Sequence, residues 1–350
     1  MNTLVTRLLH LLPPEAAHNA AIWGLSRGLA PRVVLPVEKR LQLTVAGVPF
    51  PHPLGLAAGF DKNACALDAL LRLGFSHIEA GTVTPLPQAG NPKPRIFRLQ
   101  EDAAIINRLG FNNAGLEAFC AHLAKRSGKG VVGANIGCNK ASSDRVADFV
   151  AGLQKVYPLA SYVTVNVSSP NTPNLRDMQA EEHLTSLLAA LDDARKKLHD
   201  RGVKPRPLFL KVAPDVAEEG EHPLVDMAVR HGLSGLIVSN TTVSRPEGLL
   251  SHNKQEAGGL SGTPLFEAST VQLRRLYKYA NGALIFVGAG GVRTGEDAYA
   301  KIRAGASLVQ GYTGFIYGGS GYVPAVLEGL LACMERDKVT HIRQAVGADA

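Results

Sequence analysis

The sequence is short of the residues and patterns that mark metal-binding and disulfide-bonded proteins. Its four cysteines, Cys65, Cys120, Cys138 and Cys333, show no CxxC spacing, so neither a zinc site nor a disulfide framework is indicated. Its eleven histidines form no HExxH pattern, and we expect no metal centre. A reducing compartment is the default for such a chain.

Long apolar runs and blocks of like charge are also missing. No apolar stretch reaches the roughly 18 residues that span a bilayer, and His10, Pro13 and Pro14 interrupt anything resembling a signal-peptide core. The formal net charge is +7, but no run of five or six like charges occurs, and the aromatic residues are not interleaved with basic ones. Nucleic-acid binding is therefore not expected. An anionic ligand or an acidic membrane surface explains the excess as well.

What the chain does have is a repeated strand–helix pattern of the α/β class. Of its 350 residues, 45% are hydrophobic and 19% charged, as in an ordinary globular enzyme. We expect strands at 53–57, 77–80, 131–136, 162–167, 208–212, 235–239, 283–287 and 307–310. Helical patterns follow them, for example at 63–73, 181–198, 270–280, 296–304 and 323–335. Eight such units predict a parallel (β/α)8 TIM barrel over residues 41–350, with long insertions at 84–115 and 240–262 above its top face.

Residues 1–40 are expected to form a small N-terminal module of two amphipathic helices. Leucines at near-helical spacing precede Pro13 and Pro14, and a second helical pattern begins at Glu15. Basic residues flank both helices, namely Arg7, Arg27, Arg32, Lys39 and Arg40. Two interpretations stay open, because such helices can lie in a membrane interface or pack on the surface of the barrel.

The stretch 162–176, reading YVTVNVSSPNTPNLR, changes abruptly from a strand to a stiff polar loop. Pro170 and Pro173 cannot belong to a strand interior, because they remove ladder donors and fix the backbone. The loop and the strand end carry the polar side chains Asn166, Ser168, Ser169, Asn171, Thr172 and Asn174. An ordinary turn needs only one or two such residues, so we favour a polar ligand site over simple turn chemistry.

The barrel hypothesis places chemistry at the C-terminal ends of its strands. The side chains expected there include Ala58, Lys62, Thr82, Asn135, Asn166, Lys211, Ser239, Asn240 and Thr241. The last two strands end in GAGG (288–291) and QGYTG (310–314), and glycine-rich loops at these positions favour a phosphate site over plain turns. The first is not a Rossmann fingerprint, because Arg293 stands where its last glycine would be.

The strand ends also exclude two common hydrolytic chemistries. They carry no paired carboxylates, as glycosidases do, and no histidine for a Ser-His-Asp triad. Asparagine side chains both donate and accept, so the surface suits a planar ligand with imide or amide edges. Lys62 and Lys211 would supply positive charge for an anion or a reduced cofactor, although either could be a surface residue.

Taken together, these motifs resemble the dihydroorotate dehydrogenases, and in particular their membrane-associated, quinone-reducing class 2. The segments that carry the resemblance are AAGFDKN, NPKPRIFRL, INRLGFNN, NIGCNK, VNVSSPNTPNLR, LKVAPD, SNTT, GGLSG and the two phosphate loops, and it spans about residues 7–335. The resemblance implies oxidation of dihydroorotate to orotate in pyrimidine synthesis, with FMN as the bound flavin. The proton would leave C5 of the substrate and the hydride C6, the latter going to the flavin.

The resemblance also implies a role for individual residues. It assigns FMN to Ala58, Thr82, Asn135, Asn166, Lys211, Ser239, Gly262, Gly291, Tyr312 and Thr313. It assigns the substrate to Lys62, Asn107, Arg108, Leu109, Gly110, Phe111, Asn166, Asn171, Asn240 and Thr241. Ser169 occupies the position of the base, where soluble class 1 relatives carry cysteine. Access of the quinone would involve His18, Arg98 and Tyr312.

The implied setting is the cytoplasmic face of the bacterial inner membrane, reached by peripheral association and without an obligatory protein partner. Three alternatives stay open at this point. They are a soluble class 1-like enzyme that uses fumarate or NAD, a phosphate-handling barrel lyase or isomerase without flavin, and a flavin-binding scaffold without turnover. The serine at 169 and the amphipathic first 40 residues favour the quinone-reducing class over the first alternative.

Overall fold

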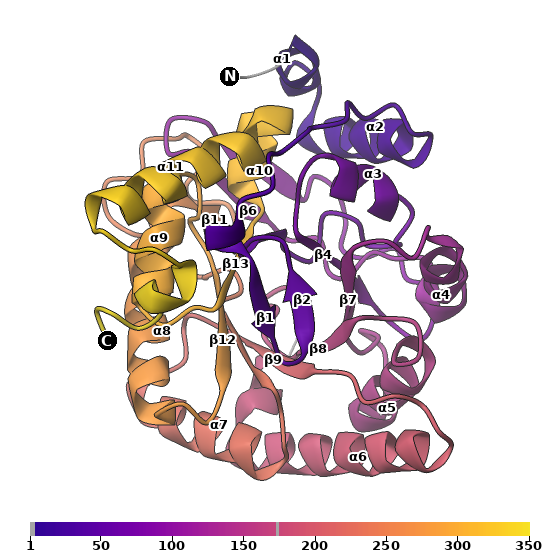
Figure 1. Ribbon diagram of the computed structural model, residues 1–350. Coiled ribbons are helices and arrows are strands. Elements are labelled where there is room, and N and C mark those ends of the chain that lie inside the picture. Colours follow the sequence, from indigo (N-terminus) through magenta and orange to yellow (C-terminus); the bar gives the residue numbers. More distant parts are fainter. Residues whose placement is uncertain (1–3, 173–174) are drawn as a thin grey trace.

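The computed structural model describes residues 4–172 and 175–350, and its centre is a closed barrel of eight parallel strands (Figure 1). In order around the barrel, these are β3 (Leu54–Leu56), β4 (His77–Val83), β7 (Val131–Ile136), β8 (Tyr162–Asn166), β9 (Leu208–Val212), β10 (Gly235–Val238), β12 (Ile285–Ala289) and β13 (Leu308–Gly311), which pairs with β3. Each predicted strand overlaps one of these, so the predicted (β/α)8 fold is confirmed. Pro173 and Asn174 of the polar loop lie outside the described residues, as do residues 1–3.

Helices form a ring around this barrel (Figure 1). They are α3 (Leu67–Arg72), α4 (Gly115–Lys125), α5 (Arg145–Val156), α6 (Glu181–Asp200), α7 (Glu218–Arg230), α8 (Phe266–Ala280), α9 (Gly295–Arg303), the short α10 (Thr313–Gly318) and α11 (Tyr322–Arg336). Single 3₁₀ turns lie at η1 (Lys39–Leu41), η2 (Arg176–Gln179), η3 (Thr263–Leu265), η4 (Gly319–Gly321) and η5 (Ile342–Ala345). Because helices cover its outside and side chains fill its inside, nearly every residue of the barrel strands is buried.

The prediction of a helix at 63–73 is wrong at its start, because α3 begins only at Leu67. The reason is the buried carboxylate of Asp61, which accepts hydrogen bonds from the backbone N–H groups of Cys65 (3.0 Å) and Ala66 (2.7 Å). Asp61 thereby holds the residues after β3 in a turn. That turn carries Lys62 at the mouth of the barrel.

An unpredicted hairpin closes the opposite, N-terminal end of the barrel. Its strands β1 (Leu43–Val45) and β2 (Val48–Phe50) lie in front of the barrel in Figure 1. Leu43, Val45 and Phe50 form an apolar cluster with inward-facing barrel residues, namely Val131, Tyr162, Phe209, Ile237, Val287 and Leu308. The end of the barrel opposite the expected site is therefore plugged by apolar side chains.

The two long insertions meet in a small antiparallel sheet that sequence analysis did not predict. The first contributes β5 (Ile96–Leu99) and β6 (Ala104–Asn107), and the second contributes β11 (Gly259–Gly262), in the order β11-β6-β5. Asn107 is paired with Gly259 on one side and with Ile96 on the other. This sheet fixes Asn107 and Gly262 at the edge of the barrel mouth.

The two N-terminal helices are confirmed as α1 (Leu4–His10) and α2 (Pro14–Ser26), with Pro14 at the first helical position, where proline is tolerated. Glu15 anchors α2 through a 2.7 Å ion pair with the buried Arg95. Arg98 donates to the carbonyl oxygens of His10 and Leu12, at 3.0 and 2.9 Å, and so holds the end of α1. In the described parts of the chain, no helix is both long and apolar enough to cross a membrane.

Candidate active site

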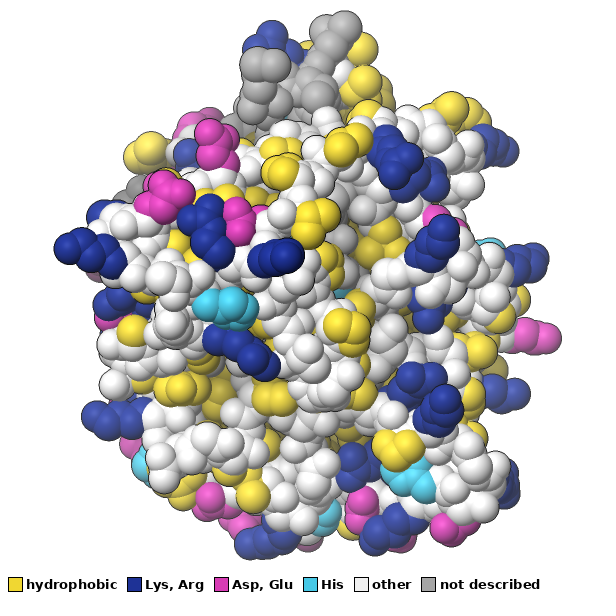
Figure 2. Space-filling view, in the orientation of Figure 1, with side chains coloured by type: hydrophobic (Ala, Val, Ile, Leu, Met, Phe, Trp, Pro, Cys, Tyr) yellow, Lys and Arg dark blue, Asp and Glu magenta, His cyan; other side chains and the backbone are white. Residues whose placement is uncertain are grey.

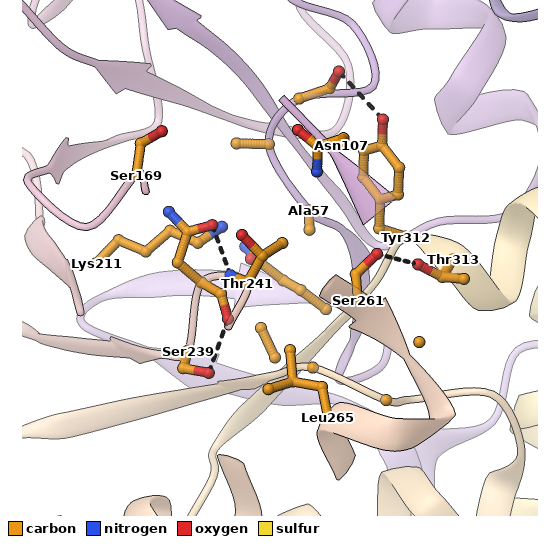
Figure 3. Close-up of a pocket in the computed structure, with 18 of the residues that line it drawn as sticks. Ala57, Asn107, Ser169, Lys211, Ser239, Thr241, Ser261, Leu265, Tyr312 and Thr313 are labelled. Carbon is orange, nitrogen blue, oxygen red and sulfur yellow. Dashed lines mark hydrogen bonds between the residues drawn. The ribbon is translucent and has the colours of Figure 1, made fainter. Parts of the chain in front are cut away.

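A large cavity opens at the C-terminal end of the barrel, where the sequence predicted the site. Its volume is about 1130 Å³, counting the part open to solvent. Figure 3 shows Ser169 and Lys211 on one side of it, and Tyr312 with Ser261 and Thr313 on the other. The two loops of the insertions supply the upper wall, and the ends of the strands supply the floor.

The structure brings most of the predicted site residues to this one cavity. Those expected at the flavin are Ala58, Thr82, Asn166, Lys211, Ser239, Gly262, Gly291, Tyr312 and Thr313. Those expected at the substrate are Lys62, Asn107, Leu109, Gly110, Phe111, Asn166, Asn171, Asn240 and Thr241, together with Ser169. The assignment of each residue to one ligand or the other stays a prediction.

Two of the predicted contact residues do not line the cavity. Arg108 forms a 2.7 Å ion pair with Glu256, and its guanidinium lies 4.5 Å from the ring centre of Phe97, on the outer side of the small sheet. Neighbouring residues of an extended segment face opposite sides, so Arg108 turns away where Asn107 turns in. Asn135 is fully buried beneath the wall, one hydrogen bond away from the cavity residue Thr82.

Beneath the cavity floor, the buried carboxylate of Glu79 is surrounded by four donors from three strands, β7, β8 and β13. It accepts from Asn135 Nδ2 (2.7 Å), Thr164 Oγ1 (3.1 Å), Gln310 Nε2 (3.0 Å) and Tyr162 OH (3.2 Å). Burial and the Glu79 carboxylate together raise the pKa of Tyr162 well above its ordinary value, which keeps that hydroxyl protonated as a donor. Four donors aimed at one carboxylate are the arrangement of an ionised acceptor.

Glu79 fixes the direction of a chain of hydrogen bonds that reaches the cavity. Because Asn135 turns its amide nitrogen to Glu79, its oxygen accepts from Thr82 Oγ1 at 2.5 Å. The Thr82 oxygen then accepts from Asn166 Nδ2 (2.9 Å), and Asn166 Oδ1 accepts from Asn240 Nδ2 (3.3 Å). The carboxylate therefore determines which atoms of Thr82, Asn166 and Asn240 remain for a ligand.

Ser169 lies in the loop after β8, buried but at the cavity wall. Its Oγ accepts from the backbone N–H of Asn171 at 3.3 Å, and Asn171 in turn donates to Asn107 Oδ1 of the insertion at 3.3 Å. Arg176 stabilises the same loop, because its guanidinium donates to the carbonyl oxygens of Ser168 (3.2 Å) and Thr241 (2.9 Å). The loop thus holds Ser169 against the strand ends.

Two lysines bring positive charge to the cavity. Lys211 is 5% exposed and has no hydrogen-bond or ion-pair partner among the described residues, and burial lowers its pKa against the opposing effect of Glu79. Lys62 Nζ donates to the carbonyl oxygen of Gly59 at 2.6 Å. Burial, and then the charge of Arg95, lower the pKa of Lys62 to about 8.

The glycine-rich loop after β12 leaves no room for side chains. Gly290 and Gly291 both line the cavity and have φ angles of 96° and 79°, a region that favours glycine. A Cβ at Gly291 would overlap Phe266 in the first turn of α8, and one at Gly290 would lie 2.8 Å from Ser269 Oγ. Backbone groups of this loop are therefore directly accessible from the cavity, as a phosphate-binding loop requires.

A second cavity lies between α2 and the mouth of the barrel, with His18, Trp23, Phe60 and Lys62 in its wall. The His18 ring packs edge-on against Phe60 (5.3 Å between ring centres), and Phe60 packs against Tyr312 (6.1 Å). Burial, and secondarily Lys62, lower the pKa of His18 to about 3. Of the residues expected at the quinone, His18 and Tyr312 thus join one aromatic path, whereas Arg98 lines neither cavity and binds the end of α1.

Comparison with known proteins gives a single family for this chain. The sequence model of the dihydroorotate dehydrogenases matches residues 40–334. The chain belongs to the dihydroorotate dehydrogenase family. It is similar to proteins named dihydroorotate dehydrogenase (quinone) from Rhizobium etli strain CIAT 652, with 52% identity over 97% of this chain and 94% of the relative, and from Agrobacterium fabrum, with 51% identity over 96% and 92%.

Solved structures of the same family agree with this placement. Dihydroorotate dehydrogenase from Eimeria tenella in complex with ferulenol is 41% identical, with a TM-score of 0.93 over 96% of this chain and 95% of that one. Its ligand-free form gives a TM-score of 0.92 over 96% and 99% of the two chains. The resemblance inferred from the sequence motifs is confirmed, and the protein is an enzyme of a flavin-dependent family.

Sequence analysis gave no individual role to two polar residues that shape the site. Gln310 lines the cavity, and its Oε1 is buried without a hydrogen-bond partner among the described residues. Glu79 does not touch the cavity but determines the polarity of its floor. The available signal was an acidic residue inside an otherwise apolar strand, a position where an unpaired charge is costly.

Proposed function

We propose that this enzyme oxidises dihydroorotate to orotate in pyrimidine biosynthesis, with FMN as its flavin and a membrane quinone as the final electron acceptor. The observation that carries the proposal is the main cavity of a chain that belongs to this family. The residues that line this cavity include a loop serine, two lysines whose pKa is lowered, several asparagines and a glycine loop with no room for side chains. A lyase or isomerase without flavin would leave the unpaired Lys211 and the aromatic path to α2 unexplained.

The residues present fit FMN at both ends of the molecule. The Gly290–Gly291 loop and Thr313 would hold the phosphate. Side chains do not fit at the two glycines, so the backbone of this loop is accessible to the phosphate. Thr82, Asn166, Lys211 and Ser239 would surround the ring, and the charge of Lys211 would offset negative charge on the reduced form. When bound, FMN supplies the hydride acceptor and passes the electrons on to the quinone.

The substrate side of the cavity carries side chains that suit a small planar anion. Lys62 would pair with the carboxylate of the substrate, and Asn107, Asn171 and Asn240 would bind the amide edges of its ring. Asn240 is already oriented, because its Oδ1 accepts from the backbone N–H of Thr241 at 2.8 Å and its Nδ2 donates to its neighbours. A ligand without matching polar edges would leave unpaired those donors and acceptors that these side chains do not use in internal hydrogen bonds, at about 1–3 kcal/mol each.

Ser169 would take the proton from C5 of the substrate at its Oγ. Serine is a weak base at neutral pH, so the proton must be passed on. Thr172, in the same loop, offers a buried hydroxyl without a hydrogen-bond partner among the described residues. Asn171 and Asn107 hold the loop in register with the insertion, which orients Ser169.

Helices α1 and α2 would take the quinone from the membrane, at the cytoplasmic face of a bacterial inner membrane. Large apolar side chains at this end of the chain are exposed to solvent, namely Val5, Leu8, Leu11, Trp23, Leu29, Val34 and Val37. Figure 2 shows hydrophobic side chains beside Lys and Arg at the upper edge of the molecule, where Figure 1 places α1 and α2. Such a mixed surface suits peripheral binding to an anionic bilayer. The path His18–Phe60–Tyr312 leads from it to the main cavity.

An anaerobic absorption experiment tests the proposal as a whole. The purified protein should show a flavin spectrum, which dihydroorotate bleaches and a quinone restores. A colourless protein would contradict the flavin assignment, and an unbleached one would leave only a flavin-binding scaffold. Reoxidation by fumarate or NAD in place of the quinone would favour the soluble type of enzyme.

A further inference from the structure

Lys301 of α9 is a buried lysine that the proposed chemistry does not use. It is 0% exposed, and among the described residues its Nζ has no carboxylate within ion-pair distance. Within the part of the chain that the structure describes, its hydrogen-bond partners are two hydroxyls of α8, Ser269 Oγ at 2.8 Å and Thr270 Oγ1 at 3.0 Å. A buried ammonium group without an anion is costly, so its presence needs a reason.

The position of Lys301 suggests that reason. Ser269 Oγ, which accepts from Lys301, lies 3.3 Å from the carbonyl oxygen of Gly290. The stem of Lys301 packs against β12, since a Cβ added at Gly288 would lie 3.1 Å from Lys301 Cδ. Gly291, the next loop residue, packs against Phe266 in the first turn of α8. The ammonium group therefore lies directly behind the glycine loop, on the side away from the cavity.

We propose that Lys301 is the buried counter-charge of the flavin phosphate, acting through the Gly290–Gly291 loop without touching the ligand. The inference rests on the proposed function, because it assumes that this loop holds the phosphate of FMN. The ligand chemistry it requires is a phosphate monoester, whose charge would be neutralised from the cavity side by the loop and from behind by Lys301. Lys301 is thus a positioning residue for the cofactor.

The protonation of Lys301 follows from this arrangement. Burial lowers its pKa to about 7, and the charges of Asp297 and Glu267 only partly oppose that effect. A phosphate bound beyond the loop favours the ammonium form and so raises this pKa. Binding of the phosphate therefore takes up a proton above about pH 7, and the contribution of Lys301 to affinity is full below that pH and declines as the pH rises.

A purely structural role makes a different prediction. If Lys301 only ties α9 to α8 through its two hydroxyl contacts, its removal should lower stability and weaken every flavin alike. If it serves the phosphate, replacing it by an apolar residue of similar length should leave the fold intact, because removing a buried charge is often neutral or stabilising. The loss should then be confined to ligands that carry the phosphate.

The test compares FMN with riboflavin, which lacks the phosphate, in full-length Lys301→Met and wild-type holoprotein. Flavin release is followed by fluorescence, with riboflavin loaded by exchange against excess. We expect Lys301→Met to weaken FMN by about 10- to 100-fold, as removal of one buried charge does at an effective dielectric constant of about 20. Riboflavin binding should change less than about twofold. Lys278→Met, which removes an exposed charge from α8, is the matched control and should change neither.

Two further measurements distinguish a role toward the phosphate from a purely structural role. The ratio of FMN affinities between wild type and Lys301→Met should shrink as the pH rises above about 7, because Lys301 then loses its proton while the phosphate, whose second pKa is about 6, keeps its double charge. Lys301→Gln retains polar contacts without charge and should also weaken FMN while sparing riboflavin, which covers the case of a misfolded Met variant. Equal weakening of both flavins, or undiminished FMN binding, would overturn the inference while leaving the function standing. A wild-type protein that binds no flavin would instead overturn the proposed function, and this inference with it.

Discussion

At the scale of single residues, a substitution of Ser169 should change the rate of catalysis without changing ligand binding. Among the described residues, its Oγ accepts one hydrogen bond, from Asn171 N at 3.3 Å, so Ser169→Ala should leave fold, flavin content and orotate binding nearly unchanged. Flavin reduction by dihydroorotate should slow by about 10²- to 10⁴-fold, the range for loss of a general base. Reoxidation by quinone should keep its rate. Stopped-flow bleaching measures the first step, and undiminished bleaching in the Ala variant would show that another group takes the proton.

Ser169→Cys is the matched control for that experiment. A thiol ionises near pH 8.5 and can accept a proton, so this variant should retain more activity than Ser169→Ala. Its rate should also rise with pH over the range where the thiolate forms.

Because of Lys62, the affinity of the site for an anionic ligand should fall as the pH rises. Burial lowers its pKa to about 8, and an anionic ligand favours the protonated form. Orotate affinity should therefore be full below about pH 8 and decline as the pH rises through and above it. Titration of the holoprotein with orotate between pH 6.5 and 9, followed by flavin absorbance, measures this. Lys62→Met should bind weakly with a flat profile, and a flat profile in the wild type would remove Lys62 from the carboxylate site.

At the scale of elements, the strands of the barrel are tied together beneath the cavity by Glu79. Glu79→Gln places an amide donor among groups that are already donors, from Asn135, Thr164 and Gln310. Asn135 can recover its bond only by rotating its amide, which would disturb Thr82 and Asn166 in turn. We expect a loss of about 1–3 kcal/mol in the free energy of unfolding, together with reduced flavin content.

Urea unfolding and the flavin-to-protein absorbance ratio measure the two effects of Glu79→Gln. The exposed Glu328→Gln on α11 makes the same chemical change without buried donors and should match the wild type. Unchanged flavin content in Glu79→Gln would show that the hydrogen-bond chain does not control the floor of the cavity.

The N-terminal helices and the barrel are expected to serve different steps of the reaction, and a deletion can test this. Deleting residues 1–38 removes His18 and the Glu15 partner of Arg95, but no strand of the barrel. Flavin reduction by dihydroorotate should stay nearly intact, whereas reoxidation by a long-chain quinone and binding to anionic liposomes should fall sharply. Full turnover with such a quinone after the deletion would refute the quinone-access role.

A milder variant distinguishes membrane binding from quinone access. Replacing the exposed Leu8 and Leu11 of the α1 region by glutamine removes apolar surface and leaves His18, Phe60 and Tyr312 in place. It should weaken liposome binding while turnover with a short-chain, water-soluble quinone persists.

At the scale of the whole molecule, the sequence predicted what depends on local pattern and missed what depends on distant partners. The barrel strands were found because strands buried on both faces read as short apolar runs. The strand-end rule then located Lys62, Ser169 and Lys211 at one cavity. The sheet of β5, β6 and β11 was missed because each strand is only four residues long and β11 pairs with β6 across about 150 residues of the chain.

The misplaced residues have the same physical origin. A motif transferred as a block predicts that Arg108 contacts the ligand. In the structure Arg108 follows the last residue of β6, and its ion pair with Glu256 holds it away from the cavity. Among the described residues neither Glu79 nor Lys301 has an ion-pair partner. No local pattern reveals this, because the groups around them belong to other elements, namely β7, β8 and β13 for Glu79 and α8 for Lys301.

The whole molecule should also lose stability in mild acid because of histidines buried in neutral form. Burial lowers the pKa of His52 to about 4 and that of His77, with a smaller effect of His52, to about 3. His77 lies between the rings of Phe50 and Tyr162, at the plugged end of the barrel. In the unfolded chain these groups take up protons below about pH 6.5, so stability falls as the pH drops from there, by up to about 1.4 kcal/mol per pH unit for each group.

Urea unfolding of the holoprotein between pH 7.5 and 5 measures this loss. His77→Gln removes one titrating group, so its stability should decline less steeply with falling pH than that of the wild type, even if it starts lower. The matched control is His252→Gln, which makes the same chemical change at an exposed position and should keep the slope of the wild type. Carboxylates that titrate near pH 5 are common to all three proteins, so they cancel in the comparison. Equal slopes in His77→Gln and wild type would mean that the buried histidines do not control acid stability.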